Sequence, residues 1–426
     1  MILKNGVVAT LDPPRVERHD LRIEGGDILE RSPDLRPHPG EDVLDLAGAF
    51  VLPGLVNAHT HLYSALARGM PGPRETPRGF VEILETVWWR LDRALDEESV
   101  SLSGLVGAIE AARSGTTVVF DHHSSPSFVE GSLATLRRSL EDVGLRSVLC
   151  YETTDRNGLA GRDAGIAENR RFLASGPTPL TGGTVGAHAA FTLGDESLDR
   201  LAALAGTGAG VHVHVAEDRC DVEDSRRRGA TGVVERLRRH GLVGERTLLA
   251  HCVHLAGAEL AEAQDAGAWL VHCPRSNANN AVGRAPTAHF RRAALGTDGL
   301  DEDMLAEARG AFLGMRDAGR DDALPAAVRM LADGHRLAEA FFGLPLGSLA
   351  AGTPADLVVL DYRPPTPLTA DNLGGHLLFG LDRSHVRSTM VAGRFVLRDR
   401  RVVGVDEDLV FTRARRAAEA LWKRMR

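Results

Sequence analysis

Two histidines one residue apart, His59 and His61, end an apolar run that begins at Val51. The run is broken by Pro53-Gly54 and otherwise has the composition of a buried strand. Side chains at positions i and i+2 of a strand point the same way, so both imidazoles can reach one point beyond the strand's end. Such convergence is what a metal site requires. The motif alone also occurs in proteins without a metal, so the rest of the chain has to decide.

Three later apolar runs also end in a possible metal ligand. His214 ends the run 211–214, His251 ends 247–251, and Asp298 ends 293–298. Neutral imidazoles with one carboxylate suit Zn²⁺ or Fe²⁺, with one coordination position left open for water. Together with His59 and His61, these residues predict a metal site.

A second carboxylate, Glu217, follows His214 by three residues. Two carboxylates beside a metal-activated water suit hydrolysis, because one can take the proton of the water and the other can give a proton to the substrate. The alternative for Glu217 is a structural role at the N-terminus of a helix.

The elements that position these residues follow a regular alternation. After the opening run, apolar segments recur at 116–123, 145–151, 183–188, 211–214, 247–251, 268–273 and 293–298. Helix-like segments such as 132–143, 196–205, 233–240 and 258–267 lie between them. Eight strands alternating with helices predict an α/β protein with a (β/α)8 barrel, in which the carboxyl ends of all strands share one mouth.

Short alternating segments at both ends of the chain predict a second, smaller unit. We expect residues 1–52 and 353–426 to pair into one β-sandwich domain, and residues 53–352 to form the barrel. Two separate β appendages are the alternative, but neither would bury a core alone.

The composition excludes several classes of function. The chain has 426 residues, of which 43% are hydrophobic and 25% charged, as in ordinary globular proteins. The net charge of −8 argues against nucleic acid or an anionic membrane as a partner. The four cysteines form no C-x-x-C pair, and no signal peptide or membrane span is recognisable, so we expect a cytoplasmic protein.

Several segments carry a family resemblance. His59-Thr-His61, His214 with Glu217, His251 and Gly-Thr-Asp298-Gly together resemble the amidohydrolase superfamily. The resemblance covers nearly the whole chain, including Gly-Thr-Pro-Ala-Asp-Leu-Val-Val-Leu at 352–360. Gly-Ala-His188 on the fourth predicted strand and Ser-Asn277 on the seventh resemble its deaminase and chlorohydrolase branch. Segments 88–98, 152–157, 216–218 and 275–280 are most similar to the SsnA-type aminohydrolases.

The resemblance implies a role for each matching residue. It implies one divalent metal, Zn²⁺ or alternatively Fe²⁺, held by His59, His61, His214 and Asp298. Glu217 would protonate a ring nitrogen and Asp298 would move the proton of the water. His251 would form a hydrogen bond with the reacting oxygen, and His188 would contact the substrate. The family also implies a homodimer.

The implied function is metal-dependent hydrolytic deamination of an aminated nitrogen heterocycle, a purine or a related compound, with release of ammonia. Hydrolysis of a ring amide or a ring halide at the same site is the alternative in the same class. A non-catalytic scaffold is the alternative in a different class. The long insertion 62–115 is expected to cover the mouth, and its Arg68 and Trp89, with Arg156 and Asn277, are candidate substrate contacts.

The distribution of lysine limits the number of metals. Binuclear members of the superfamily commonly bridge their metals with a modified lysine at the end of strand four, and no lysine lies between Lys4 and Lys423. A lysine-bridged pair is therefore excluded. Glu152, at the end of the third predicted strand, is the alternative bridging carboxylate, or else it is bonded to a protein partner or faces the substrate.

Overall fold

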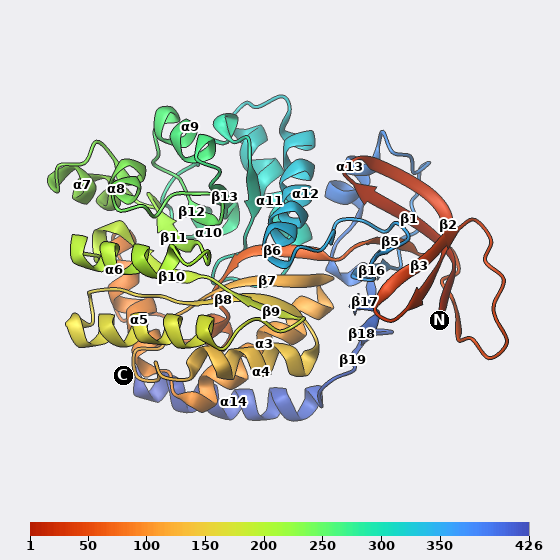
Figure 1. Cartoon of the computed structure of the whole chain (residues 1–426), viewed down its shortest axis with the longest axis horizontal. Coiled ribbons are helices and arrows are strands. Elements are labelled where there is room, and N and C mark those ends of the chain that lie inside the picture. The colour runs from red at the N-terminus through yellow and green to blue at the C-terminus, as the bar shows by residue number, and fades with distance from the viewer. Residues whose placement is uncertain (426) are drawn as a thin grey trace.

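The protein has a barrel of parallel strands and a separate β-sheet formed by both ends of the chain (Figure 1). The structure is a computed structural model that describes residues 1–425. The barrel strands are β6 (Leu55–Thr60), β7 (Thr116–His123), β8 (Arg146–Tyr151), β9 (Thr181–Gly183), β10 (Val185–Ala189), β11 (Val211–Val215), β12 (Thr247–His251), β13 (Trp269–His272) and β14 (Ala293–Leu295).

These strands form two parallel sheets that isolated bridges join into a closed barrel. The sheets are β6-β7-β8-β9 and β10-β11-β12-β13-β14. Thr153 bridges to Ala187 on one side, and Thr60 bridges to Asp298 on the other. The predicted (β/α)8 barrel is confirmed, with its fourth strand in two pieces, β9 and β10. The prediction that Ser276 and Asn277 lie on strand seven is wrong, because β13 ends at His272 and a helix begins at Pro274.

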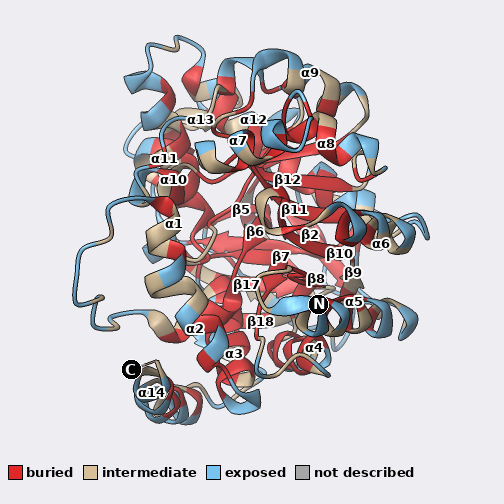
Figure 2. Ribbon diagram, turned by 90° about the vertical axis from the view of Figure 1, so that its left-hand side faces the viewer, coloured by how far each residue is buried: buried red, intermediate tan, exposed pale blue. Residues whose placement is uncertain are grey.

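Helices surround the barrel and bury their inner faces against it. In Figure 2 the barrel strands are red, which marks buried residues, and the exposed outer turns are pale blue. Long helices are favoured by clear start signals, such as the capping box that Asp96 and Ser99 form at the first of them. The helices between the barrel strands are α3 (Glu97–Arg113), α4 (Ser132–Val143), α5 (Gly158–Ala174), α6 (Asp195–Ala205), α7 (Arg219–Arg227), α8 (Val233–Arg239), α9 (Gly257–Asp265) and α10 (Pro274–Asn279), and α11 (Met304–Asp317) and α12 (Ala323–Phe342) follow β14. No helix among residues 1–425 combines the length and apolarity that a membrane crossing needs.

Shorter helical segments lie in the connections. They are η1 (Leu62–Ala67), α1 (Phe80–Ile83), η2 (Leu84–Trp88), α2 (Trp89–Ala94), η3 (Ala190–Thr192), η4 (Thr287–His289), α13 (Leu373–Gly375), η5 (His376–Gly380) and η6 (Arg383–His385). The first four belong to the insertion after β6, and all four supply residues to the cavity described below.

The two ends of the chain share one ten-stranded sheet, which confirms a small β domain built from both termini. Its central contact is the antiparallel pairing of β5 with β16. The strands are β1 (Ile2–Leu11), β2 (Pro14–Glu24), β3 (Asp27–Ser32), β4 (Val43–Asp45), β5 (Phe50–Pro53), β15 (Thr353–Pro354), β16 (Leu357–Leu360), β17 (Val386–Val391), β18 (Arg394–Arg398) and β19 (Arg401–Val402). The last helix, α14 (Glu407–Arg424), leaves this sheet and packs along α3 of the barrel (Figure 1).

The Pro53-Gly54 break divides the opening apolar run between the two units. Residues up to Pro53 pair with β16 in the terminal sheet, and Leu55 onward pairs with β7 in the barrel. Gly54 lies so close to β7 that a Cβ atom would come within 2.2 Å of the Thr117 side chain. The run that ends in His59 and His61 is therefore the first barrel strand, which the terminal sheet anchors at its start.

Candidate metal centre and active site

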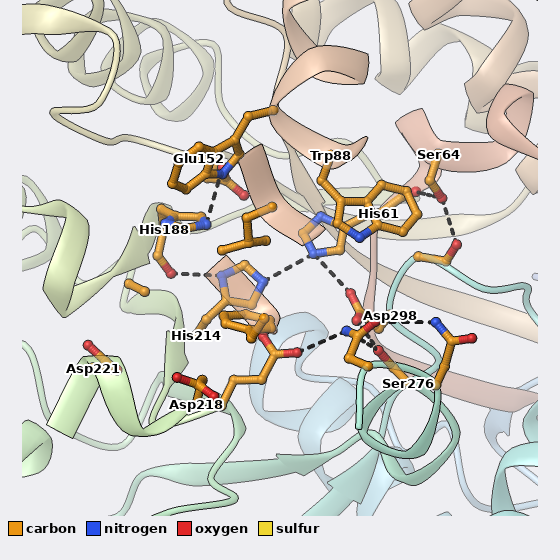
Figure 3. Close-up of a pocket in the computed structure, with 18 of the residues that line it drawn as sticks. His61, Ser64, Trp88, Glu152, His188, His214, Asp218, Asp221, Ser276 and Asp298 are labelled. Atoms are coloured by element: carbon orange, nitrogen blue, oxygen red, sulfur yellow. Dashed lines mark hydrogen bonds and ion pairs between the residues drawn. The ribbon is translucent and has the colours of Figure 1, made fainter. Parts of the chain in front are cut away.

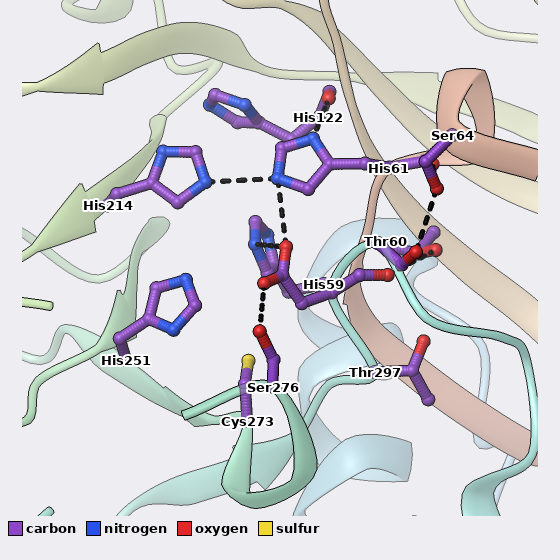
Figure 4. Close-up of polar contacts among 12 residues, drawn as sticks. His59, Thr60, His61, Ser64, His122, His214, His251, Cys273, Ser276 and Thr297 are labelled. Atoms are coloured by element: carbon purple, nitrogen blue, oxygen red, sulfur yellow. Dashed lines mark hydrogen bonds and ion pairs between the residues drawn. The ribbon is translucent and has the colours of Figure 1, made fainter. Parts of the chain in front are cut away.

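The predicted ligands come together at the mouth of the barrel, where the donor atoms of His59, His214, His251 and Asp298 lie within 4.8 Å of one another. Figure 4 shows His61 beside these histidines. His59 and His61 come from the end of β6, His214 from β11, and Asp298 from the turn after β14. His61 Nε2 lies 3.1 Å from His214 Nε2 and 3.1 Å from Asp298 Oδ1. His59 Nε2 lies 3.5 Å from Asp298 Oδ1. These are separations at which four donor atoms can share one ion.

Backbone carbonyl groups fix the orientation of two of these rings. His61 Nδ1 donates to the carbonyl oxygen of His122 at 2.6 Å, and His214 Nδ1 donates to that of His188 at 2.7 Å. Each ring therefore carries a proton on Nδ1 and presents Nε2 toward the other ring as the atom that can bind an ion. Metal-binding histidines are commonly held by such a contact through the second nitrogen.

The third ring has an open nitrogen. His59 Nδ1 lies 2.9 Å from His212 Nε2, and His59 Nε2 is buried with no hydrogen-bond partner among the described residues. Burial lowers the pKa of His59 to about 3 and lowers the pKa of His214 well below its ordinary value. Both rings are thus neutral, as a metal ligand must be.

The buried carboxylate of Asp298 would be stabilised by a positive charge at the point where the imidazole nitrogens converge. Burial would raise the pKa of Asp298, but the neighbouring imidazoles of His59 and His61 outweigh burial and hold it well below its usual range. Burial likewise would lower the pKa of His61, but Asp298 raises it to about 9, so Asp298 favours a cation, a proton or a metal ion, at His61 Nε2. The hydroxyl of Ser276 donates to the other oxygen of Asp298. A divalent cation between these nitrogens would supply the charge that Asp298 requires.

A second set of possible ligands lies beside the first. The donor atoms of His61, His122, Glu152 and His214 are within 4.8 Å of one another. Glu152 is already engaged, because Arg156 donates to its Oε1 at 3.1 Å and its Oε2 lies 3.2 Å from His122 Nδ1. It is thus bonded to protein partners, one of the alternatives expected from the sequence.

The predicted acid lies next to the ligands. Glu217 follows β11, is 8% exposed and accepts from Asn280 Nδ2 at 3.2 Å. Its Oε2 lies 3.5 Å from His251 Nε2, and His251 Nδ1 donates to Asn277 Oδ1 at 2.9 Å. Burial raises the pKa of Glu217 to about 7, so this carboxyl group can hold and release a proton near neutral pH.

Strained backbone marks the same strand ends. Ala216, His251 and Asp298 have φ angles of 47°, 70° and 55°. Residues other than glycine rarely adopt these left-handed conformations, and where they occur they cluster at functional sites. The strain directs Glu217, His251 and Asp298 into the same mouth.

An aromatic cavity lies above the predicted ligands (Figure 3), with about 760 Å³ of space between its walls and the adjoining solvent. Its floor includes His61, His214, Glu217 and Asp298, and its remaining polar residues include Glu152 and Ser276. Its apolar lining comes from Tyr63, Phe80, Leu84, Trp88, Trp89 and Phe191. The insertion after β6 supplies most of these rings, so it covers the mouth as expected.

The structure separates the candidate substrate contacts into two groups. His188, Trp89 and Arg156 line the cavity. Arg68 does not, because its half-exposed side chain turns outward to bond with Glu110. Asn277 is also absent from the lining, because its side chain accepts from His251.

Arg156 lines the cavity, but its positive charge is already paired with carboxylates of the protein. It donates to Asp92 and Glu152, and its guanidinium carbon lies 5.0 Å from the centre of the Trp89 ring. The Trp89 ring in turn meets that of His188 edge to face at 6.3 Å. Arg156 thus stabilises the part of the cavity wall that Trp89 and His188 form.

Some site residues were not predicted from the sequence. Phe80, Leu84 and Phe191 come from connections whose path no local pattern specifies. His212 was detectable, because it precedes His214 by two residues on a strand and so faces the same side.

Comparisons with known proteins agree with this architecture. The sequence matches the amidohydrolase family over residues 50–396. The chain belongs to the amidohydrolase family. A curated member, the 5'-deoxyadenosine deaminase of Methanosarcina mazei, is 30% identical over 100% of this chain and 99% of its own length. Another, the 5-methylthioadenosine/S-adenosylhomocysteine deaminase of Pyrococcus furiosus, is 30% identical over 96% of this chain and 98% of its own length.

A solved amidohydrolase structure also superposes on the whole chain. The adenosine deaminase of Xanthomonas campestris, determined with bound zinc, has a TM-score of 0.87 and 25% identity and covers 99% of this chain and 98% of its own. The chain therefore shares its fold with a structure that contains zinc, and its predicted ligands are of the types that zinc prefers.

Proposed function

We propose that this amidohydrolase is a metal-dependent hydrolytic deaminase of an aminated nitrogen heterocycle of the purine type, which releases ammonia. The observation that carries the proposal is the position of Glu217. This buried acid lies beside the convergent ligands His59, His61, His214 and Asp298, at the floor of an aromatic cavity. The deaminase names of the relatives support the reaction class.

The chain's own residues divide the chemical work. A divalent ion such as Zn²⁺, when bound, activates a water molecule for attack on the ring carbon. Asp298 is the carboxylate that can accept the proton of that water, and Glu217 is the acid that can protonate a ring nitrogen. His251 faces Glu217 through Nε2 and can hydrogen-bond the reacting oxygen. Trp89 and His188 form walls on which a flat ring can stack.

The charges in the cavity favour an uncharged substrate. Among the described residues of its lining, Arg156 is the only arginine or lysine, and Asp92 and Glu152 bind it. Glu217, Asp218 and Asp221 add further carboxyl groups to the lining. A phosphate or carboxylate group inside the cavity would find no free cationic partner, and burying an unpaired charge is costly. We therefore propose a free base or an unphosphorylated nucleoside as the substrate.

Ammonia release from a matched panel tests this function. The zinc-loaded protein is incubated with adenosine, 5'-deoxyadenosine and guanine, and with adenosine 5'-monophosphate as the charged partner of adenosine. We expect ammonia from at least one uncharged compound. Chloride release from a chlorinated triazine, or ring opening without ammonia, would replace the deaminase assignment with the alternative hydrolases. Equal rates with adenosine and its monophosphate would contradict the charge argument alone.

A further inference from the structure

Three of the four predicted metal ligands come from the two sides of one seam in the barrel. His59 lies on β6, the first barrel strand, His61 directly follows it, and Asp298 follows β14, the last. The backbone contacts across this seam at the level of the ligands include the Thr60–Asp298 bridge and a hydrogen bond from Asp298 N to His59 O at 3.0 Å. Gly296 lets the strands approach closely, because a Cβ there would meet His59 at 2.7 Å.

A buried glutamate outside the proposed reaction connects the two sides. Glu302 lies four residues after Asp298, and its Oε2 accepts from Asn57 Nδ2 at 2.6 Å. Its Oε1 lies 2.7 Å from Thr60 Oγ1, which is itself 3.2 Å from the carbonyl oxygen of Asp298. Both partners are on β6, on either side of His59.

Asn57 extends the connection to the residue before Asp298. Its Nδ2 donates to Thr297 Oγ1 at 2.6 Å, and its Oδ1 accepts from the backbone N–H of Thr297 at 3.1 Å. Asn57, Thr297 and Thr60 are at most 1% exposed. The side chains therefore tie β6 to the loop that carries Asp298 at two points.

Glu302 itself has an unusual environment for a glutamate. It is 4% exposed, and no arginine, lysine or histidine among the described residues forms an ion pair with it. Glutamate is almost never buried so fully without a partner cation. Burial raises its pKa well above the ordinary range, which favours the protonated, uncharged form.

The neutral form completes the hydrogen bonds. A threonine hydroxyl has one proton. If Thr60 donates this proton to the Asp298 carbonyl, the acid proton of Glu302 can serve the Thr60 oxygen, while the other oxygen of Glu302 accepts from Asn57. A glutamine at position 302 could make the same two contacts, with its N–H toward Thr60 and its oxygen toward Asn57.

We propose that Glu302 is a positioning residue for the metal centre. Through Asn57 and Thr60 it fixes Asp298 relative to His59 and His61, and so sets the geometry in which the ion is held. The inference concerns retention of the metal and does not depend on which ring the enzyme attacks.

The test compares three variants at the seam with one control. Glu302→Leu and Thr60→Val break the connection, and Glu302→Gln preserves it. Glu168→Leu is the control, because Glu168 is 2% exposed and accepts from the backbone N–H groups of Gly131 and Leu133, on the helix side of the barrel. The zinc dissociation constant is measured by competition with a chelator, and the absorption spectrum of the cobalt-substituted protein reports the coordination geometry.

We expect Glu302→Leu and Thr60→Val to weaken zinc binding about 10- to 100-fold, the usual effect of losing a partner behind the ligands, and to alter the cobalt spectrum. Glu302→Gln should behave like the original chain. Glu168→Leu should lower thermal stability and leave the zinc affinity of the folded protein unchanged. Unaltered zinc affinity in both Glu302→Leu and Thr60→Val would overturn the proposal, and so would an equal loss in Glu302→Gln and Glu302→Leu.

Discussion

His251 donates its Nδ1 proton to the Oδ1 atom of Asn277 at 2.9 Å, and this contact leaves Nε2 as the nitrogen that faces Glu217. With the proton on Nδ1, the lone pair of Nε2 points toward Glu217 Oε2, 3.5 Å away. Glu217 and His251 can therefore share a hydrogen bond only when one of them carries an additional proton. Asn277 thus acts on the reaction through His251.

Replacing Asn277 by leucine should impair turnover without loss of metal. We expect kcat to fall about 10- to 100-fold with little change in KM, because His251 loses its fixed tautomer and orientation. Steady-state kinetics and metal analysis of Asn277→Leu measure both effects. Arg68→Ala is the matched comparison from the same set of predicted contacts, and it should leave both constants unchanged because Arg68 bonds Glu110 outside the cavity. A larger defect in Arg68→Ala than in Asn277→Leu would contradict the placement of these two side chains.

Replacing Glu217 by glutamine should remove the acid and keep the shape of the site. We expect kcat to fall about 10²- to 10⁴-fold, the usual contribution of a general acid, while the metal content stays constant. Single-turnover kinetics on zinc-loaded Glu217→Gln would measure this loss. Undiminished turnover would show that another group protonates the ring.

The pH dependence of kcat should reflect the titration of Glu217. Burial raises the pKa of Glu217 to about 7, so the protonated acid predominates below that pH and disappears as the pH rises through it. We expect kcat to decline above pH 7, about tenfold for each further pH unit. The residual activity of Glu217→Gln should lack this decline, because glutamine does not titrate. The same alkaline limb in the variant would assign the titration to a different group.

The sequence predicted the parts of the site that depend on strand periodicity. His59, His61, His214, His251 and Asp298 were predictable because barrel topology brings the carboxyl ends of parallel strands together. The Pro53-Gly54 break was visible, but its consequence was not, since a local pattern does not say that two halves of one run join different sheets.

The side-chain directions in the segments that connect strands and helices were less predictable than the strand ends. Arg68 and Asn277 have side chains suited to binding a heterocycle, but their direction depends on partners far away in the sequence, Glu110 and His251. The family resemblance put Ser276 on the seventh strand, although Pro274 is a good first residue of a helix. The homodimer and the cytoplasmic location implied at the outset remain predictions.

The final prediction separates the metal ligands from other buried histidines of the same barrel. His61→Ala should lose bound zinc, because His61 Nε2 lies 3.1 Å from both His214 Nε2 and Asp298 Oδ1. His123→Gln should keep it, because His123 is equally buried but bonds Ser125 Oγ at 2.8 Å. Metal analysis after dialysis should therefore find about one zinc per chain in the original protein and in His123→Gln, and none in His61→Ala. Chelation should abolish ammonia release, and added zinc should restore it in the original chain and not in His61→Ala. Retention of zinc by His61→Ala would instead assign the ion to His59, His214, His251 and Asp298, the set that does not include His61.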